Sequence, residues 1–169
     1  MIFMKKDVKI KIVSRVYDLQ QSDKIEKYIE EHPDYAEDDI SMKFEVSCRG
    51  IMSEAEGVFT LSYDEPADNG MGKTTTVITF HRDAPGTVTL SREGEVRSHF
   101  VNDEALPRRT YLYETPLMPF EMAIVTKSVV NRMGVRGGTL HLDYKMDMNG
   151  SNMERTVLDL LVRPLEGVI

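Results

Sequence analysis

Apolar and polar residues alternate with a period of two along most of this chain. In the clearest stretch, every second position is apolar: Ile40, Met42, Phe44, Val46 and Cys48. Such alternation is typical of a β-strand with one buried face and one solvated face. The pattern recurs in ten stretches, which are 8–17, 40–48, 57–64, 74–82, 87–92, 95–101, 110–115, 120–130, 139–148 and 153–162. The alternation therefore predicts ten strands.

Glycine-containing sequences typical of turns separate the predicted strands, at 68–70, 84–86, 93–94, 134–138 and 149–150. Asn149-Gly150 is the strongest hairpin signal, because both residues accept positive φ, and Glu93-Gly94 also stands between two alternating stretches. Short connections and the lack of a long helix favour sequential antiparallel pairing. We expect an all-β fold, a closed up-and-down antiparallel β-barrel of eight to ten strands. A β-sandwich is the alternative, because alternation alone does not show closure.

The negative charge of the chain is concentrated in one segment. Residues 18–39 hold nine acidic residues and two lysines, an excess that equals the whole net charge of -7. Within this acidic insertion, Ser22 can cap one short helix that ends before His32-Pro33. Charge runs are usually solvated loops, and we favour that interpretation here. The alternative is a docking surface for a basic protein partner.

Composition limits the class of protein. The 169 residues, 41% of them hydrophobic, fit a single globular domain spanning 1–169. The acidic balance argues against nucleic acid and against acidic membranes as partners. Cys48 is the single cysteine, so the chain has no internal disulfide framework. Because we find neither a secretory signal nor a stretch long enough to span a membrane, we expect a cytoplasmic protein.

No motif predicts a cofactor, a metal site or a catalytic residue. Residues 67–74 fit a relaxed phosphate-loop pattern, but the β-branched run that follows Lys73 favours a strand where such a loop needs a helix. The four histidines lie in separate segments without metal-ligand spacing. Asp143, Asp147 and Asn149 lack the spacing of a calcium loop.

Several polar residues fall inside predicted strands, where alternate side chains of a barrel point inward. The candidates for lining an interior ligand site are Tyr63, Glu65, Thr75, Arg92, Tyr113 and Thr126. An inward Arg92 would need a partner such as Glu65 or an anionic ligand, because an unpaired buried charge is costly. Its place beside the predicted Glu93-Gly94 turn instead favours exposure to solvent.

Five segments, taken in order, resemble the YwiB-like bacterial family of unknown function (domain of unknown function 1934). They are 61–65, 70–76, 88–94, 113–116 and 137–144, and the resemblance covers roughly residues 5–162. It implies a calycin-like, lipocalin-like β-barrel, a fold whose members bind small and often apolar ligands. The chain departs from the family pattern in the acidic stretch after Asp18 and at 117–120, beside the rim of any pocket. The family has no established activity, so the resemblance carries over no catalytic residue.

Together these observations favour a small-molecule-binding barrel without evident catalytic activity. The first alternative is an interaction or regulatory module that uses its acidic outer surface. An enzyme with Glu65 as general base is the least favoured hypothesis, because no nucleophile or orienting group accompanies that residue. The oligomeric state stays open, with a homodimer as one alternative.

Overall fold

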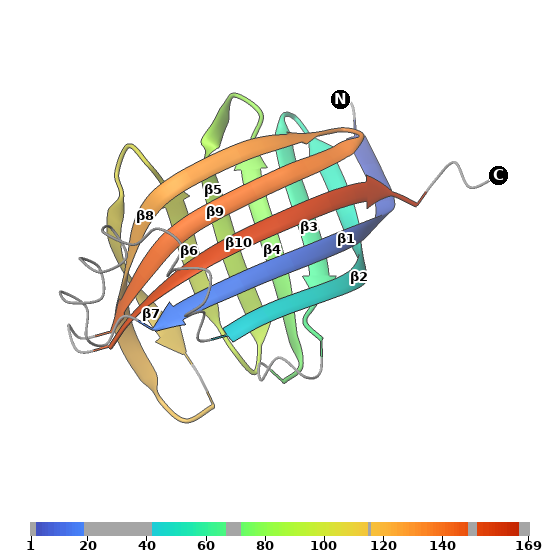
Figure 1. The fold of residues 1–169 in the computed structure, drawn as a ribbon. Coiled ribbons are helices and arrows are strands. Elements are labelled where there is room, and N and C mark those ends of the chain that lie inside the picture. Colours follow the sequence, from blue (N-terminus) through green and yellow to red (C-terminus); the bar gives the residue numbers. More distant parts are fainter. Residues whose placement is uncertain (1–2, 19–41, 67–71, 115, 149–151, 166–169) are drawn as a thin grey trace.

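The protein is an all-β fold of ten antiparallel strands in a computed structural model, which describes residues 3–18, 42–66, 72–114, 116–148 and 152–165 (Figure 1). The strands are β1 (Phe3–Asp18), β2 (Met42–Ala55), β3 (Val58–Asp64), β4 (Thr74–His81), β5 (Ala84–Gly94), β6 (Ser98–Asp103), β7 (Arg108–Glu114), β8 (Pro119–Gly134), β9 (Gly137–Met148) and β10 (Asn152–Pro164). Each lies where alternation predicts a strand, so the predicted all-β class is confirmed.

The strands form one sheet whose order is β6-β5-β4-β3-β2-β1-β10-β9-β8-β7. Consecutive strands are neighbours except β6 and β7, which form the two edges, and β1 pairs with β10 at the centre of the sheet. The sheet curls until its edge strands, β6 and β7, approach each other (Figure 1). The predicted up-and-down topology is therefore confirmed.

Closure is less complete than expected, because β6 and β7 share no backbone ladder in the described part of the chain. Side chains bridge the seam instead. The Tyr111 hydroxyl accepts a hydrogen bond from the Val101 amide at 3.0 Å, and the rings of Phe100 and Tyr111 pack edge to face. Further along, the Asn131 side chain donates to the carbonyl of Pro85 at 3.1 Å. The barrel is therefore nearly closed, and side-chain contacts connect its two edges where a continuous backbone ladder is absent from the described residues.

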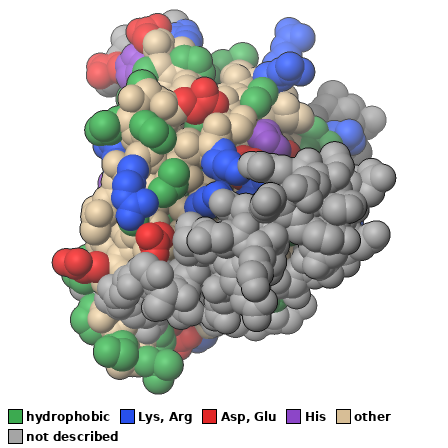
Figure 2. Space-filling view, turned by 60° about the vertical axis from the view of Figure 1, so that its left-hand side comes forward, with side chains coloured by type: hydrophobic (Ala, Val, Ile, Leu, Met, Phe, Trp, Pro, Cys, Tyr) green, Lys and Arg blue, Asp and Glu red, His purple; other side chains and the backbone are tan. Residues whose placement is uncertain are grey.

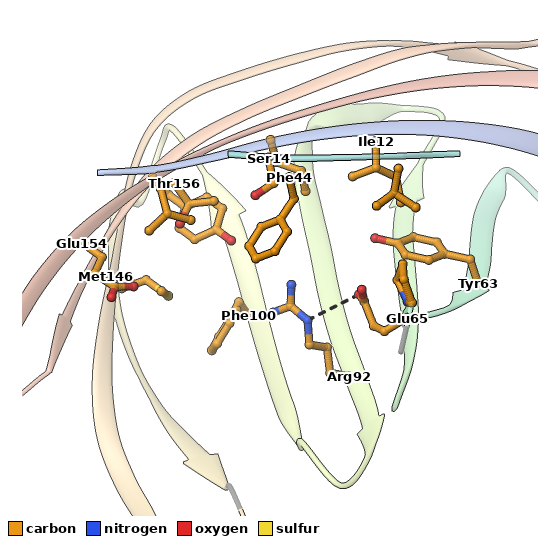
Figure 3. Close-up of a pocket in the computed structure, with 15 residues that line it drawn as sticks. Ile12, Ser14, Phe44, Tyr63, Glu65, Arg92, Phe100, Met146, Glu154 and Thr156 are labelled. Atoms are coloured by element: carbon orange, nitrogen blue, oxygen red, sulfur yellow. Dashed lines mark ion pairs between the residues drawn. The ribbon is translucent and has the colours of Figure 1, made fainter. Parts of the chain in front are cut away.

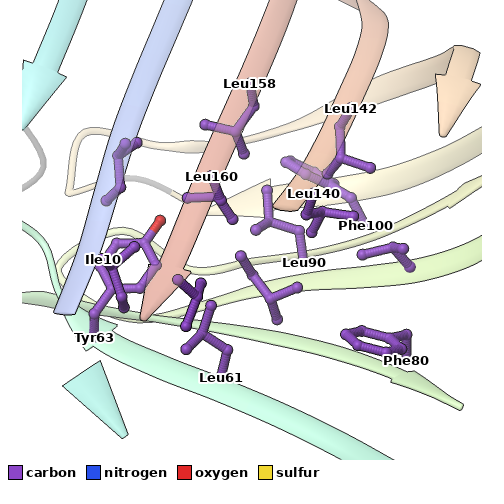
Figure 4. Close-up of a cluster of buried hydrophobic side chains, with 14 of the residues drawn as sticks. Ile10, Leu61, Tyr63, Phe80, Leu90, Phe100, Leu140, Leu142, Leu158 and Leu160 are labelled. Carbon is purple, nitrogen blue, oxygen red and sulfur yellow. The ribbon is translucent and has the colours of Figure 1, made fainter. Parts of the chain in front are cut away.

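A cluster of buried apolar side chains fills part of the barrel interior (Figure 4). Inward residues of β3 to β6 lie in rows, and the central row pairs Leu61 with Ile78, Ile78 with Leu90, and Leu90 with Phe100. Side chains from β1, β9 and β10 cover this row, namely Ile10, Leu140, Leu142, Leu158 and Leu160. Apolar burial on this scale is the main stabilising contribution to the fold.

A glycine permits the close approach of three strands at this core. Gly50 on β2 is buried, and a Cβ at its position would lie 2.5 Å from the Ile10 side chain and 2.6 Å from the carbonyl oxygen of Ser62. Any side chain at position 50 would therefore push β1 and β3 away from β2.

Two predicted turns are strands. Glu93-Gly94 ends β5, and the turn comes after it, at residues 95–97. Gly94 pairs with Thr74, and a Cβ there would lie 2.1 Å from the carbonyl oxygen of Lys73, so this glycine serves a close strand approach. Residues 84–86 begin β5, and the preceding turn is at 82–83.

Some predictions concern residues outside the described ranges. They are the short helix after Ser22, most of the acidic insertion 18–39, the Asn149-Gly150 turn and residues 67–71. The run after Lys73 is strand β4, as its β-branched residues predict.

The outer surface beside β7 mixes residue types. Figure 2 shows hydrophobic side chains interspersed with basic and acidic ones on the described part of this face. The exposed hydrophobic side chains of the β7 region are Leu106, Leu112, Leu117 and Met118. No single type of side chain covers the described part of this surface.

Candidate functional site

A cavity of about 250 Å³ lies beside the apolar core in the barrel interior. It lies at the end where β1, β3, β5 and β9 finish and where β2, β4, β6 and β10 begin. Side chains from both halves of the sheet line it (Figure 3). The cavity is therefore enclosed by strands that are distant in sequence.

A row of polar residues runs along this side of the barrel, and two of its members, Tyr63 and Arg92, line the cavity. Tyr63 on β3 pairs with Thr76 on β4, Thr76 pairs with Arg92 on β5, and Arg92 pairs with Ser98 on β6. On each strand this row lies two residues from the apolar row of Leu61, so its side chains point into the same interior. The change from apolar to polar residues thus marks where the core ends and the cavity begins.

Arg92 points into the barrel, so the expected solvent exposure is wrong. Its side chain is 13% exposed, and its guanidinium extends into the cavity toward Glu65 (Figure 3). Arg92 Nε lies 3.9 Å from Glu65 Oε1, and the Glu65 side chain is 7% exposed. The expectation failed because it placed Arg92 at a turn, whereas β5 continues through Gly94 and keeps Arg92 on the face of Leu90.

Glu65 is held at the end of β3 by its backbone and its side chain. Its amide donates to the Thr74 carbonyl at 2.8 Å, which continues the β3–β4 pairing by one residue. Its carboxylate accepts a short hydrogen bond from the Thr76 hydroxyl. The carboxylate is therefore oriented before any ligand arrives.

Tyr63 presents its phenol to the same cavity (Figure 3). Burial raises the pKa of Tyr63 well above its ordinary value, and the negative charge of Glu65 raises it further. The phenol is therefore protonated at neutral pH, and its hydroxyl can donate a hydrogen bond.

The remaining walls are mainly apolar. Phe44 and Val46 from β2, Phe100 from β6, Met146 from β9 and Leu158 from β10 face the cavity. Few polar residues interrupt them, and the sequence did not single them out: Ser14, Glu154 and Thr156. Glu154 lies near Met146, on the far side of the cavity from Glu65 (Figure 3). The lining is therefore mainly apolar, with Arg92 and Glu65 on one side and a few polar residues on the other.

Two predicted lining residues, Thr75 and Thr126, lie elsewhere, and the side chain of a third, Tyr113, is outside the described part of the chain. Thr75 lies on the outer face of β4, where its hydroxyl donates to Asp64 at 2.8 Å, because its neighbours Thr74 and Thr76 take the inward positions. Thr126 is buried, but it belongs to the seam, where it accepts a hydrogen bond from the Asp103 amide at 3.2 Å. Tyr113 is part of β7, and its side chain is not among those the structure describes.

A model of the family described as "Domain of unknown function (DUF1934)" matches residues 28–160. The chain belongs to this family. The crystal structure of the YwiB protein from Bacillus subtilis is similar to this DUF1934 protein, with a TM-score of 0.63 over 93% of this chain and 92% of that one. At 16% sequence identity, this similarity shows a shared fold. No curated protein matches the sequence. The resemblance that the five sequence segments indicate is therefore confirmed.

Other chemistry in this DUF1934 chain is sparse among the described residues. They contain no group of three or more His, Cys, Asp or Glu side chains arranged to hold a metal ion. They also contain no helix with the length and hydropathy of a membrane span. Cys48 packs against the core, and burial together with Glu65 raises the pKa of its thiol. At neutral pH the thiol is protonated and is a poor nucleophile.

Proposed function

We propose that this DUF1934 protein binds a small molecule inside its barrel and has no catalytic role. The observation that carries the proposal is the cavity of about 250 Å³, lined by apolar walls and by Tyr63, Glu65 and Arg92. Sites of this kind, with a few polar groups converging in an apolar cavity, are typical of ligand binding.

A comparison of the cavity with the packed core of the same barrel supports this interpretation. Beside the cavity, buried apolar side chains of the same strands pack against one another, so the described strands can fill the interior with side chains. Filling the cavity with larger apolar side chains would increase apolar burial and stability. A cavity that costs stability is expected where it serves binding.

Catalysis by Glu65 is less well supported. Its carboxylate contacts Thr76 and Arg92, and neither group is an activated nucleophile. The alternative of a basic protein partner on residues 18–39 concerns residues outside the described ranges and stays a prediction.

The experiment uses N-phenyl-1-naphthylamine, a neutral apolar probe whose fluorescence rises in apolar surroundings. Ser14→Leu adds bulk to the cavity wall, whereas Ser47→Leu makes the same change at an exposed position of β2. We expect saturable binding to the wild type and to Ser47→Leu, and at least about tenfold weaker binding to Ser14→Leu. Equal binding to both variants, or no saturable binding to the wild type, would overturn the proposal.

A further inference from the structure

We infer that the ligand is a small amphiphile with a single negative charge, held by Arg92 at one end and by the aromatic and aliphatic walls at the other. A carboxylate is the group that best fits. This inference rests on the proposed function and adds the chemical class of the ligand.

The first argument is that Arg92 is incompletely satisfied by the protein. A buried guanidinium is costly unless its N–H groups are hydrogen-bonded. Glu65 is its charged partner, but a separation of 3.9 Å is too long for a hydrogen bond. Nε of Arg92 is buried without a hydrogen-bond partner among the described residues. The guanidinium therefore retains donors for a further acceptor.

A second polar atom beside Arg92 also lacks a hydrogen-bond partner among the described residues. Ser98 pairs with Arg92 across β5 and β6, and its hydroxyl is buried with no hydrogen-bond partner in the part of the chain that the structure describes. Ser98 itself does not line the cavity, so the unpaired Nε of Arg92, which does line it, is the observation that indicates a missing acceptor. An oxyanion beside the Arg92 guanidinium would supply that acceptor.

The charges lining the cavity set the charge of the ligand. Arg92 is the single cation among the described lining residues, whereas Glu65 and Glu154 are anionic. One guanidinium matches one carboxylate in geometry and in charge. A doubly charged phosphate would meet the two glutamates with no second cation to offset them. The single guanidinium therefore limits the ligand to one negative charge.

Size and shape define the rest of the ligand. A cavity of about 250 Å³ lies at the lower end of the range for small-molecule sites, so the ligand is smaller than a drug-sized molecule. Phe44 and Phe100 line the same cavity as the Arg92 head group (Figure 3). A short chain or single ring attached to the carboxylate would place its apolar atoms against these side chains.

Three probes of nearly equal shape test the charge: 4-phenylbutanoate, its neutral amide 4-phenylbutanamide, and the cation 4-phenylbutan-1-amine. Each displaces N-phenyl-1-naphthylamine from the wild type, from Arg92→Met/Glu65→Gln and from the control Arg97→Met. The double variant removes both charges, so that no buried carboxylate is left unpaired. Arg97 is exposed in the connection between β5 and β6. Its substitution by Met therefore removes one positive charge outside the cavity and is the matched control.

We expect the wild type and Arg97→Met to bind the carboxylate at least about tenfold more tightly than the amide, the margin of one charge-assisted hydrogen bond. The double variant should lose this preference and still bind the amide. Equal binding of carboxylate and amide by the wild type, or tighter binding of the amine, would overturn the inference while leaving the proposed function intact. Failure of all three probes to displace the bound fluorescent probe would overturn the inference alone, whereas a wild type that does not bind the fluorescent probe would overturn the proposed function.

Discussion

Removing the charge of Arg92 alone should destabilise the protein far more than removing Arg92 and Glu65 together. The two charges lie 3.9 Å apart with exposed side-chain fractions of 13% and 7%. At an effective dielectric constant of about 20, Coulomb attraction at that separation is about 4 kcal/mol. The desolvation of both ions offsets much of this attraction, so the pair adds little net stability.

The two substitutions differ in what they leave behind. Arg92→Met keeps most of the side-chain volume but leaves the Glu65 carboxylate buried and without its cation, which should cost about 3 to 5 kcal/mol. In Arg92→Met/Glu65→Gln the amide still accepts the Thr76 hydrogen bond and no buried charge is left. The double variant should therefore lie within about 1 kcal/mol of the wild type, or above it.

Urea denaturation followed by far-ultraviolet circular dichroism measures the free energy of unfolding for the wild type, both single variants and the double variant. Lys11→Met is the control, because Lys11 pairs with Glu45 at 3.4 Å while both side chains are more than half exposed. Its cost should stay within about 0.5 kcal/mol. If the two single costs add up to the double cost within about 0.5 kcal/mol, the two charges do not interact and the reasoning fails.

Three further predictions test the fold around the cavity. Gly50→Ala should cost about 1 to 3 kcal/mol, because its Cβ would lie 2.6 Å from the Ser62 carbonyl oxygen, whereas Gly86→Ala meets no atom within 4 Å and should be nearly neutral in thermal unfolding. Tyr111→Phe removes the acceptor of a 3.0 Å hydrogen bond from β6 and should cost about 1 kcal/mol, with faster amide exchange in β6 and unchanged exchange in β3. Since burial raises the pKa of Tyr63 in the folded state, stability should be intact below the unfolded pKa of 10.0 and fall as pH rises above it. Tyr63→Phe should fall less steeply over that range, and equal slopes would contradict this account.

The strands and their order could be predicted because a period of two is visible in the sequence and short connections favour neighbouring pairs. The same alternation indicates which side chains of each strand point into the barrel. Val88 and Leu90 share a face with Arg92, and Ile78 shares one with Thr76, not with Thr75. Alternation alone therefore contained the signal for Arg92 and against Thr75. The competing turn interpretation of Glu93-Gly94 obscured it.

Glycine was the misleading residue type, because it has two uses. In a turn it supplies positive φ, and in a sheet it allows a neighbouring backbone to come close. Gly94 has a φ of +140° and lies against the Lys73 carbonyl, so it serves the sheet. A sequence without the β4–β5 register cannot separate these two uses.

The cavity itself could not be predicted from local patterns. Phe44 and Leu158 line it from strands on either side of β1, and both are opposite Ser14 in the registers of β2 and β10. The β1–β10 register connects residues more than 100 positions apart. The break in alternation along β8, where the register shifts between Thr126 and Ser128, likewise depends on the pairing with β9.

The apolar core and the cavity beside it together support one conclusion about Arg92. Apolar residues of similar volume would extend the row of Leu61, Ile78 and Leu90 into the cavity and avoid the desolvation of two ions. An ion pair that adds little stability and leaves a buried donor without a hydrogen-bond partner is poorly suited to stabilising the fold. It is well suited to recognising a ligand. If the variant without both charges is as stable as the wild type yet loses its preference for a carboxylate, then the charges contribute to binding and not to folding.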